Sequence, residues 1–344
     1  MLEKERIEAS PVELTRDDFV SDQMVKWCPG CGAHAILAAV GNVFPKIGYR
    51  KENFAMVSGI GCSSRFPYYV NTYGFHGIHG RAAAIASGLK LSNPGLSVWI
   101  ATGDGDSMAI GGNHFIHILR RNIDVNIMLF NNQIYGLTKG QYSPTTPMGS
   151  VTKTSPYGTI EHPFIVAGLV MGAQGTFFAR VPDNNVKLMT EVMYEAAKHD
   201  GTSVVEILQN CIIFADKTHG EVVDREHRDE KQLILRHGEP MIFGKNRDKG
   251  IMLVGNHLKV VTIGDNGVVK SDILVHDQYN RDPGIHRMIG RMAGPEFPVA
   301  MGVIRSAPFE TYDDLLEEQI EQAKKSSRIR SVNDLLRSGD TFEV

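Results

Sequence analysis

The residues best suited to chemistry lie in two short stretches, Gly103-Asp104-Gly105-Asp106 and Asn131-Asn132-Gln133-Ile134. A short apolar run that predicts a buried strand precedes each stretch, and apolar residues at helical spacing lie between them. The pattern predicts a strand–helix–strand unit with parallel strands, whose carboxyl ends share one edge of a sheet. A carboxylate, a side-chain amide and a backbone carbonyl are hard oxygen ligands that suit Mg²⁺, and glycines let backbone approach a phosphate. This edge therefore favours a magnesium diphosphate.

The order Gly-Asp-Gly and then Asn-Asn, one helix and one strand later, resembles the signature of thiamin-diphosphate enzymes. The tripeptide alone is equally typical of a tight turn capped by an aspartate, and the paired asparagines favour the cofactor. In that family the Asp and the second Asn bind Mg²⁺, together with a carbonyl two residues later. The resemblance implies that Asp104, Asn132 and the backbone of Ile134 hold the metal.

Four cysteines, Cys28, Cys31, Cys62 and Cys211, are a second set of candidate ligands. So few in a chain of this size argue for a metal or catalysis rather than a disulfide framework. Cys62 and Cys211 each follow a predicted strand, as Asp104 does, so we expect them to meet at the same sheet edge. Four thiolates suit either tetrahedral zinc or a [4Fe–4S] cluster. The chain lacks the two local knuckles of a typical structural zinc site, which favours the cluster and leaves zinc as the alternative.

The composition excludes several other classes of protein. The chain has 344 residues, with 36 Lys and Arg against 39 Asp and Glu, and no basic block that would indicate nucleic acid or a membrane surface. No apolar run approaches the roughly 20 residues of a membrane span. The charged start Met1–Arg6 has no apolar segment, so we expect no signal peptide and a cytoplasmic protein.

Alternating apolar runs and helical patterns predict an α/β fold, with a mostly parallel sheet and helices on both faces. Expected strands cover residues 54–57, 96–101, 125–130, 176–180 and 203–208, and expected helices cover 34–44, 82–91, 108–121, 163–172, 185–199 and 312–325. We expect an N-terminal arm over 1–25, a cofactor-binding domain over 26–217, and a C-terminal extension over 218–344 that packs on the domain or on a partner subunit. Within the extension, Asp265-Asn266-Gly267 predicts the turn of a hairpin between 260–263 and 268–270.

Taken together, the motifs resemble the beta subunit of a 2-oxoacid:ferredoxin oxidoreductase. They span residues 27–211 and are Trp27-Cys28-Pro29-Gly30-Cys31-Gly32, Ser58-Gly59-Ile60-Gly61-Cys62-Ser63, His79-Gly80-Arg81, Gly103-Asp104-Gly105-Asp106, Asn131-Asn132 with Tyr135-Gly136-Leu137-Thr138-Lys139-Gly140-Gln141, and Cys211. The resemblance implies that the four cysteines hold a [4Fe–4S] cluster. It also implies a set of thiamin diphosphate contacts, namely Ile60, Gly61, Cys62, Ser63, His79, Gly105, Asp106, Gly136 and Leu137.

The implied reaction is the oxidative decarboxylation of a 2-oxoacid with coenzyme A, which gives acyl-CoA, CO₂ and reduced ferredoxin, or its reverse. The implied partners are ferredoxin and an alpha subunit in an (αβ)₂ assembly, because only one α/β module that could hold thiamin is visible here. Two alternatives are a thiamin-dependent decarboxylase with structural cysteines and a zinc-stabilised, non-catalytic subunit that binds a nucleotide diphosphate.

Two cations bear on the choice of substrate. Arg65 follows Cys62 by three residues, and its planar guanidinium suits the far carboxylate of a dicarboxylic 2-oxoacid. Lys139, just beyond the Asn-Asn segment, could add a second cation. These residues favour 2-oxoglutarate, with succinyl-CoA as product, over pyruvate as the alternative. An equally open interpretation of Arg65 is a surface arginine paired with a nearby carboxylate.

Overall fold

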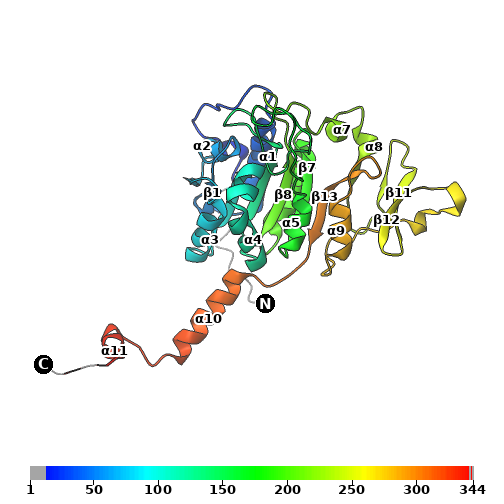
Figure 1. Ribbon diagram of the computed structural model, residues 1–344. Coiled ribbons are helices and arrows are strands. Elements are labelled where there is room, and N and C mark those ends of the chain that lie inside the picture. Colours follow the sequence, from blue (N-terminus) through cyan, green and yellow to red (C-terminus); the bar gives the residue numbers. More distant parts are fainter. Residues whose placement is uncertain (1–12, 341, 343–344) are drawn as a thin grey trace.

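A computed structural model describes residues 13–340 and residue 342, and its centre is an eight-stranded sheet (Figure 1). The strand order is β2-β1-β3-β4-β8-β7-β13-β9. In that order the strands are Tyr73–His76, Phe54–Ser58, Ser97–Gly103, Asn126–Asn131, Ser203–Leu208, Phe177–Pro182, Val299–Ser306 and Gln232–Ile234. Neighbours pair in parallel, except that β13 runs antiparallel to β7. The prediction of a mostly parallel sheet is therefore confirmed.

Helices cover both faces of the sheet, which explains why the central strands are continuous apolar runs (Figure 1). One core joins the sheet to α1 (Ala33–Ile47) and α6 (Val186–Lys198). The core of the other face includes side chains of four helices, α3, α4, α5 and α9. Their bounds are Ala82–Ser92, Gly112–Arg121, Val166–Gly172 and Gly284–Gly290. Every residue of β4 and β8 is buried, as burial on both faces requires.

The unit predicted around Asp104 is present as β3, α4 and β4. A π-helical turn, η4 (Asp106–Ile110), precedes α4, and the helix ends at Asn122 in the left-handed conformation (φ 53°). Gly103 at the end of β3 is in register with Phe130 of β4. Asp104 and Asn131 therefore leave neighbouring strands side by side, as the sequence predicts.

The expected boundary near residue 217 does not separate two structural units. Strands β9 and β13 lie beyond it in the chain, and both belong to the central sheet. The remaining strands are β5 (Ile134–Tyr135), β6 (Gln141–Tyr142), β10 (Ile242–Phe243), β11 (Lys249–Val254) and β12 (His257–Thr262), and the short helices are α2 (Phe66–Tyr69), α7 (Gly220–Val223) and α8 (Arg228–Lys231). The C-terminal segment thus completes the fold.

The predicted hairpin is wrong in its position. The antiparallel pair is β11 with β12, and its tight turn follows the pair Val254 and His257. Gly255 in that turn has φ +60°, which only glycine adopts readily. The stretch 265–267 forms a short 3₁₀ turn instead. Its Asp-Asn-Gly sequence suits any turn with positive φ, so the turn signal alone could not identify the strands.

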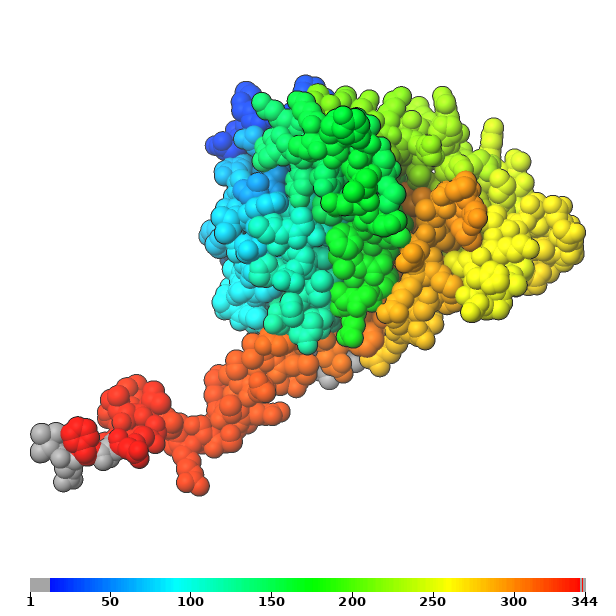
Figure 2. All heavy atoms as spheres, viewed as in Figure 1, coloured from blue at the N-terminus to red at the C-terminus, as the bar shows by residue number. Residues whose placement is uncertain are grey.

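Beyond the sheet the chain continues into an arm of two helices, α10 (Tyr312–Ser326) and α11 (Val332–Leu336), which projects from the body (Figures 1 and 2). The Asp124 amide donates to Asp313 Oδ1 (3.1 Å) at the base of the arm. Leu315 and Val332 are 52% and 73% exposed on it. The charged helix predicted over 312–325 is confirmed. No helix in residues 13–340 has both the length and the apolar character that crossing a membrane requires.

The expected N-terminal arm falls only partly within the described structure, since residues 1–12 lie outside it. Phe19, near its end, is buried, and its ring packs edge-on against those of Phe44 (5.4 Å) and Phe54 (5.3 Å). This part of the arm therefore belongs to the core.

We expect acid to destabilise the protein through the buried His276, whose ring contacts the backbone of β13. Its Nε2 donates to the Val303 carbonyl (2.9 Å), and burial lowers its pKa to about 4. An unfolded histidine titrates near 6.5, so between pH 6.5 and 4 the unfolded chain binds more protons and stability falls with the pH. At pH 5 this histidine lowers the free energy of unfolding by roughly 2 kcal/mol relative to neutral pH.

Denaturant titrations at pH 7.5 and pH 5 test this expectation. The variant His276→Gln keeps a donor for Val303 but has no group that titrates in this range. It should lose roughly 2 kcal/mol less stability than the wild type between the two pH values. An equal loss in both proteins would show that His276 does not cause the acid sensitivity.

Candidate active site

Asp104 lies at the carboxyl end of β3 and is only 2% exposed. Its Oδ2 accepts hydrogen bonds from the hydroxyls of Ser143 and Thr145, both at 2.5 Å, in the loop that follows β6. Burial raises the pKa of the Asp104 carboxyl to about 6, although both hydroxyls lower it. No lysine or arginine of residues 13–340 forms an ion pair with it.

A buried chain of polar contacts runs from Asp104 across the sheet. The Thr145 hydroxyl also lies 2.9 Å from Asn131 Oδ1, and Asn131 Nδ2 donates to Glu206 Oε1 (2.7 Å). Arg180 pairs with the other oxygen of Glu206 at 2.7 Å. Because Glu206 accepts from Asn131 Nδ2 on one oxygen and from Arg180 on the other, the Asn131 amide is fixed with its oxygen toward Thr145. The loop after β6 is thereby tied to the sheet at the candidate metal ligand.

The other two candidate magnesium ligands leave β4 at the same edge. Asn132 Oδ1 accepts from the Ile134 amide (3.2 Å), and Asn132 Nδ2 donates to Gln209 Oε1 (3.3 Å). Ile134 pairs with Tyr142 in the small sheet of β5 and β6. A buried carboxylate without a cation, beside an amide oxygen and backbone carbonyls, is a donor set that fits Mg²⁺. That these residues bind Mg²⁺ remains a prediction.

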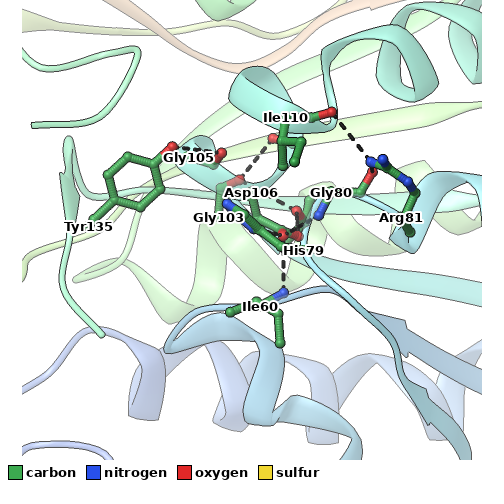
Figure 3. Close-up of polar contacts among 11 residues, drawn as sticks. Ile60, His79, Gly80, Arg81, Gly103, Gly105, Asp106, Ile110 and Tyr135 are labelled. Atoms are coloured by element: carbon green, nitrogen blue, oxygen red, sulfur yellow. Dashed lines mark hydrogen bonds and ion pairs between the residues drawn. The ribbon is translucent and has the colours of Figure 1, made fainter. Parts of the chain in front are cut away.

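The carboxylate of Asp106 accepts four hydrogen bonds from the protein itself (Figure 3). Its Oδ1 accepts from the Ile60 amide (3.0 Å), His79 Nδ1 (2.7 Å) and the Gly80 amide (2.8 Å). Its Oδ2 accepts from the Thr102 hydroxyl (2.8 Å). The segments of Ile60 and His79, both expected at the cofactor, thus meet at one side chain.

Gly105 allows the ring of Tyr135 to approach the backbone closely at this edge. A Cβ atom on Gly105 would lie 2.2 Å from Cε1 of Tyr135, whose hydroxyl donates to the Gly105 carbonyl (3.1 Å; Figure 3). Burial, followed by the charges of Asp104 and Asp106, raises the pKa of Tyr135 to about 12. Tyr135 is therefore a neutral donor at neutral pH.

The four cysteines come from three parts of the chain, and the other three lie within electrostatic reach of Cys62. A Cβ atom on Gly136 would lie 3.6 Å from Sγ of both Cys62 and Cys211. Burial, and then the neighbouring thiols of Cys31, Cys211 and Cys28, raise the pKa of Cys62 to about 11. Burial likewise raises the pKa of Cys31, with contributions from Cys211 and Cys28. The predicted convergence of Cys62 and Cys211 is confirmed.

Within residues 13–340 no three His, Cys, Asp or Glu side chains are close enough together to hold a metal ion. Side chains from other parts of the chain contact two of the cysteine segments. Trp27 Nε1 donates to the Cys62 carbonyl (2.7 Å), and Gln209 Nε2 lies 3.5 Å from Cys31 Sγ. Gln209 also contacts Asn132, so one side chain touches both a candidate cluster ligand and a candidate magnesium ligand.

The two candidate substrate cations are both exposed. Arg65 lies in the 3₁₀ turn after Cys62, and its charge acts to lower the pKa of that thiol. Lys139 lies in the turn after β5 with φ 77°. Neither side chain forms an ion pair with a described residue, so the alternative of a paired surface arginine is not what the structure shows. Leu137 in the same turn is 51% exposed.

Sequence reasoning missed several residues of this edge. Ser143, Thr145, Tyr135 and Gln209 all contact candidate ligands or cofactor residues, yet none of the four is among the predicted site residues. The hydroxyls of Ser143 and Thr145 have one weak sequence signal, the clustering of Ser and Thr residues after Gln141.

Comparisons with known proteins agree with this geometry. The family model of the thiamine pyrophosphate enzyme C-terminal TPP binding domain matches residues 59–207. The chain is 47% identical to the 2-oxoglutarate oxidoreductase subunit KorB of Mycobacterium tuberculosis, over 95% of this chain and 88% of that protein. It is 44% identical to the 2-oxoglutarate synthase subunit KorB of Archaeoglobus fulgidus, over 56% of this chain and 73% of that protein.

A solved structure is also similar over nearly its whole length. The 2-oxoglutarate:ferredoxin oxidoreductase from Magnetococcus marinus, solved with 2-oxoglutarate, coenzyme A and succinyl-CoA bound, superposes with a TM-score of 0.77. The match has 28% sequence identity and covers 97% of this chain and 99% of the other. The resemblance carried by the cysteine, Gly-Asp-Gly and Asn-Asn motifs is thus confirmed, and the chain belongs to the KorB family of 2-oxoacid:ferredoxin oxidoreductase beta subunits.

Proposed function

We propose that this chain supplies the thiamin diphosphate and [4Fe–4S] half of a CoA-dependent 2-oxoglutarate:ferredoxin oxidoreductase. The reaction converts 2-oxoglutarate and coenzyme A into succinyl-CoA and CO₂, passes two electrons to ferredoxin, and can run in reverse as a carboxylation. The observation that carries this proposal is that the Asp104 stretch and the Cys62 loop meet at one sheet edge, joined by the bond from the Ile60 amide to Asp106 (3.0 Å).

Asp104, Asn132 and the carbonyl of Ile134 would hold Mg²⁺ and, through it, the diphosphate. The support is that Asp104 is buried without a cation partner and is fixed by two hydroxyls at 2.5 Å. Thiamin diphosphate, when bound, supplies the carbon nucleophile that makes cleavage next to a ketone possible. The absence of a side chain on Gly105 lets the Tyr135 ring pack directly on this backbone, and the Tyr135 hydroxyl holds the Gly105 carbonyl in place.

Cys28, Cys31, Cys62 and Cys211 would hold the cluster, which when bound carries single electrons toward ferredoxin. The proximity of their thiols supports this assignment, because each of the other three raises the pKa of Cys62. Ligation requires thiolates, so assembly must release protons from thiols that burial keeps protonated. Trp27 holds the Cys62 backbone and Gln209 points toward Cys31.

Arg65 would select 2-oxoglutarate by binding its far carboxylate. Its charge acts to lower the pKa of the Cys62 thiol, which places it near that loop, and it forms no ion pair with a carboxylate of the described residues. Lys139 lies on the turn that includes Gly136 and could contribute a second positive charge. A pyruvate-specific site would have no use for a cation at this place.

Replacing Arg65 with methionine should lower kcat/KM for 2-oxoglutarate about ten- to a hundredfold, since a charge-assisted contact contributes roughly 1.5–3 kcal/mol. Pyruvate turnover should be unchanged or higher. Viologen reduction by the assembled enzyme with each acid measures both values. Arg50→Met, at the opposite end of the sheet, is the matched control. Equal loss on both acids would assign Arg65 to the cofactor loop and leave pyruvate as an equal candidate.

The chain would hold only half of the active site. Activation of thiamin in such enzymes uses a glutamate from a second α/β module, and only one module is present in residues 13–340. The loop anchored at Ser143 and Thr145 carries apolar side chains that nothing described covers, with Tyr157 100% and Ile160 89% exposed. We propose that an alpha subunit covers this loop in an (αβ)₂ assembly.

The test of this function is an anaerobic assay of the chain alone and with its alpha subunit. With 2-oxoglutarate and coenzyme A, the pair should reduce ferredoxin. The chain alone should reach at most about one hundredth of that rate, because general acid–base assistance is worth about 10²–10⁴-fold. Full activity of the isolated chain would contradict the half-site proposal, and an assembled pair that binds thiamin without oxidising any 2-oxoacid would contradict the function.

A further inference from the structure

Asp106 differs from Asp104 because protein donors occupy both oxygens of its carboxylate, whereas both hydroxyl donors to Asp104 lie on Oδ2. It is 2% exposed, and both of its oxygens are occupied by the four hydrogen bonds described above. We therefore expect only the backbone of Asp106, and not its side chain, to contact the cofactor. Its side chain must have another role.

Two segments from distant parts of the chain meet at this one carboxylate (Figure 3). The Ile60 amide belongs to the loop that carries Cys62, a candidate cluster ligand. His79 and Gly80 form the turn before α3 on the other side. The contact between the loops is tight, because a Cβ atom on Gly59 would lie 2.0 Å from Asp106 Oδ2. A shift of either segment must therefore move Asp106.

The bond from Nδ1 to Asp106 fixes the orientation of the His79 ring. Nε2 is then the ring nitrogen left free to meet a ligand, and the His79 side chain is 38% exposed. The ring packs edge-on toward Tyr135, with 6.3 Å between the centroids, and Tyr135 in turn contacts Gly105, so His79 lies on the side of residues 103–106. His79 is thus held at the place where a diphosphate would lie.

We infer that Asp106 is a positioning residue that couples the diphosphate site to the cysteine site. It acts through His79 on the diphosphate and through the Ile60 amide on the loop of Cys62. This inference rests on the proposed function, because it requires that both ligands bind. A ligand that pulls on His79 shifts the loop of Cys62 through a single buried side chain, and the cluster senses the occupancy of the thiamin site.

The variant Asp106→Asn separates charge from shape. Its amide oxygen must face the three donors on the Oδ1 side, because an NH₂ group there would oppose three N–H groups. Its NH₂ group then faces the Thr102 hydroxyl, which can accept. The geometry is kept, but the charge-assisted bonds become neutral ones of roughly half the strength. Thr102→Val, which removes only the Oδ2 contact, is the matched control.

The readout is the visible circular dichroism and the EPR spectrum of the cluster in the anaerobic αβ complex, before and after addition of Mg²⁺ and thiamin diphosphate. In the wild type and Thr102→Val we expect the cofactor to change the cluster signal. In Asp106→Asn we expect an intact cluster whose signal no longer responds, and a thiamin diphosphate Kd raised about tenfold. Should Asp106→Asn fail to fold, His79→Phe keeps a ring at this position but removes the Nδ1 donor to Asp106, and it should also remove the response.

A full response of the cluster signal in Asp106→Asn or in the His79 variant would overturn the inference. A wild type that binds both thiamin diphosphate and the cluster without any change of signal would overturn it as well. A wild type that takes up no thiamin diphosphate or no iron would instead contradict the proposed function. The two failures are therefore distinguishable in one series of samples.

Discussion

Asp104→Ala should abolish Mg²⁺-dependent binding of thiamin diphosphate while the protein keeps its iron and its colour. Asp104 is the only carboxylate among the proposed magnesium ligands, and it is buried between two hydroxyls at 2.5 Å. Loss of an outer-shell partner of a metal ligand already costs about 10–100-fold in affinity, so loss of this ligand should raise the Kd by more than about a hundredfold. Calorimetric titration with thiamin diphosphate, with and without Mg²⁺, measures the effect.

The cluster is the internal control for that experiment, since the cysteine segments make no contact with the Asp104 side chain. Asp200→Ala, an exposed aspartate at the opposite edge of the sheet, controls for the general effect of removing a charge. Wild-type binding by Asp104→Ala would exclude Asp104 as a ligand. Parallel loss of iron and thiamin would show that the substitution only unfolds the domain.

Cys211→Ser should have the converse effect. A serine hydroxyl is a hard, weakly acidic ligand that replaces a thiolate poorly on iron, so we expect loss of most of the iron and of ferredoxin reduction. Thiamin diphosphate should still bind with a Kd within a few-fold of the wild type, because Asp104 and Asn132 are untouched. Iron analysis and visible absorbance after anaerobic purification measure the loss.

The neighbouring variant Ile213→Ala, which alters an exposed side chain, should keep the cluster. A Cys211→Ser protein with full iron content would mean that Cys211 is not a ligand. A colourless wild type containing zinc would revive the alternative in which these cysteines are structural.

The core of the fold was predictable where one local pattern decided the outcome. Strand β8 was predicted at its observed bounds, and β3 and β4 within two residues, because strands buried on both faces are continuous apolar runs. Strand β13 was not predicted. Its run contains Gly302 with φ +96° and a register shift between Val303 and Arg305, and its partner β7 lies far away in the sequence.

The candidate site was also predictable only in part. Motif spacing identified Asp104, Asn132 and the cysteines, because strand ends in a parallel sheet share an edge. Motif spacing could not identify the role of the Asp106 side chain. Two of its donors are backbone amides, 46 and 26 residues away, and backbone amides have no sequence signature. The same holds for Thr145, whose role depends on where a loop folds back.

The late position of β13 in the chain has a consequence for biosynthesis. When β7 leaves the ribosome, the strand that will pair with its free edge is still about 120 residues from completion. At roughly 5–20 residues per second, that edge stays open for about 6–25 s. An unpaired strand beside an apolar core invites aggregation, so this interval is when chaperones matter most for the nascent subunit.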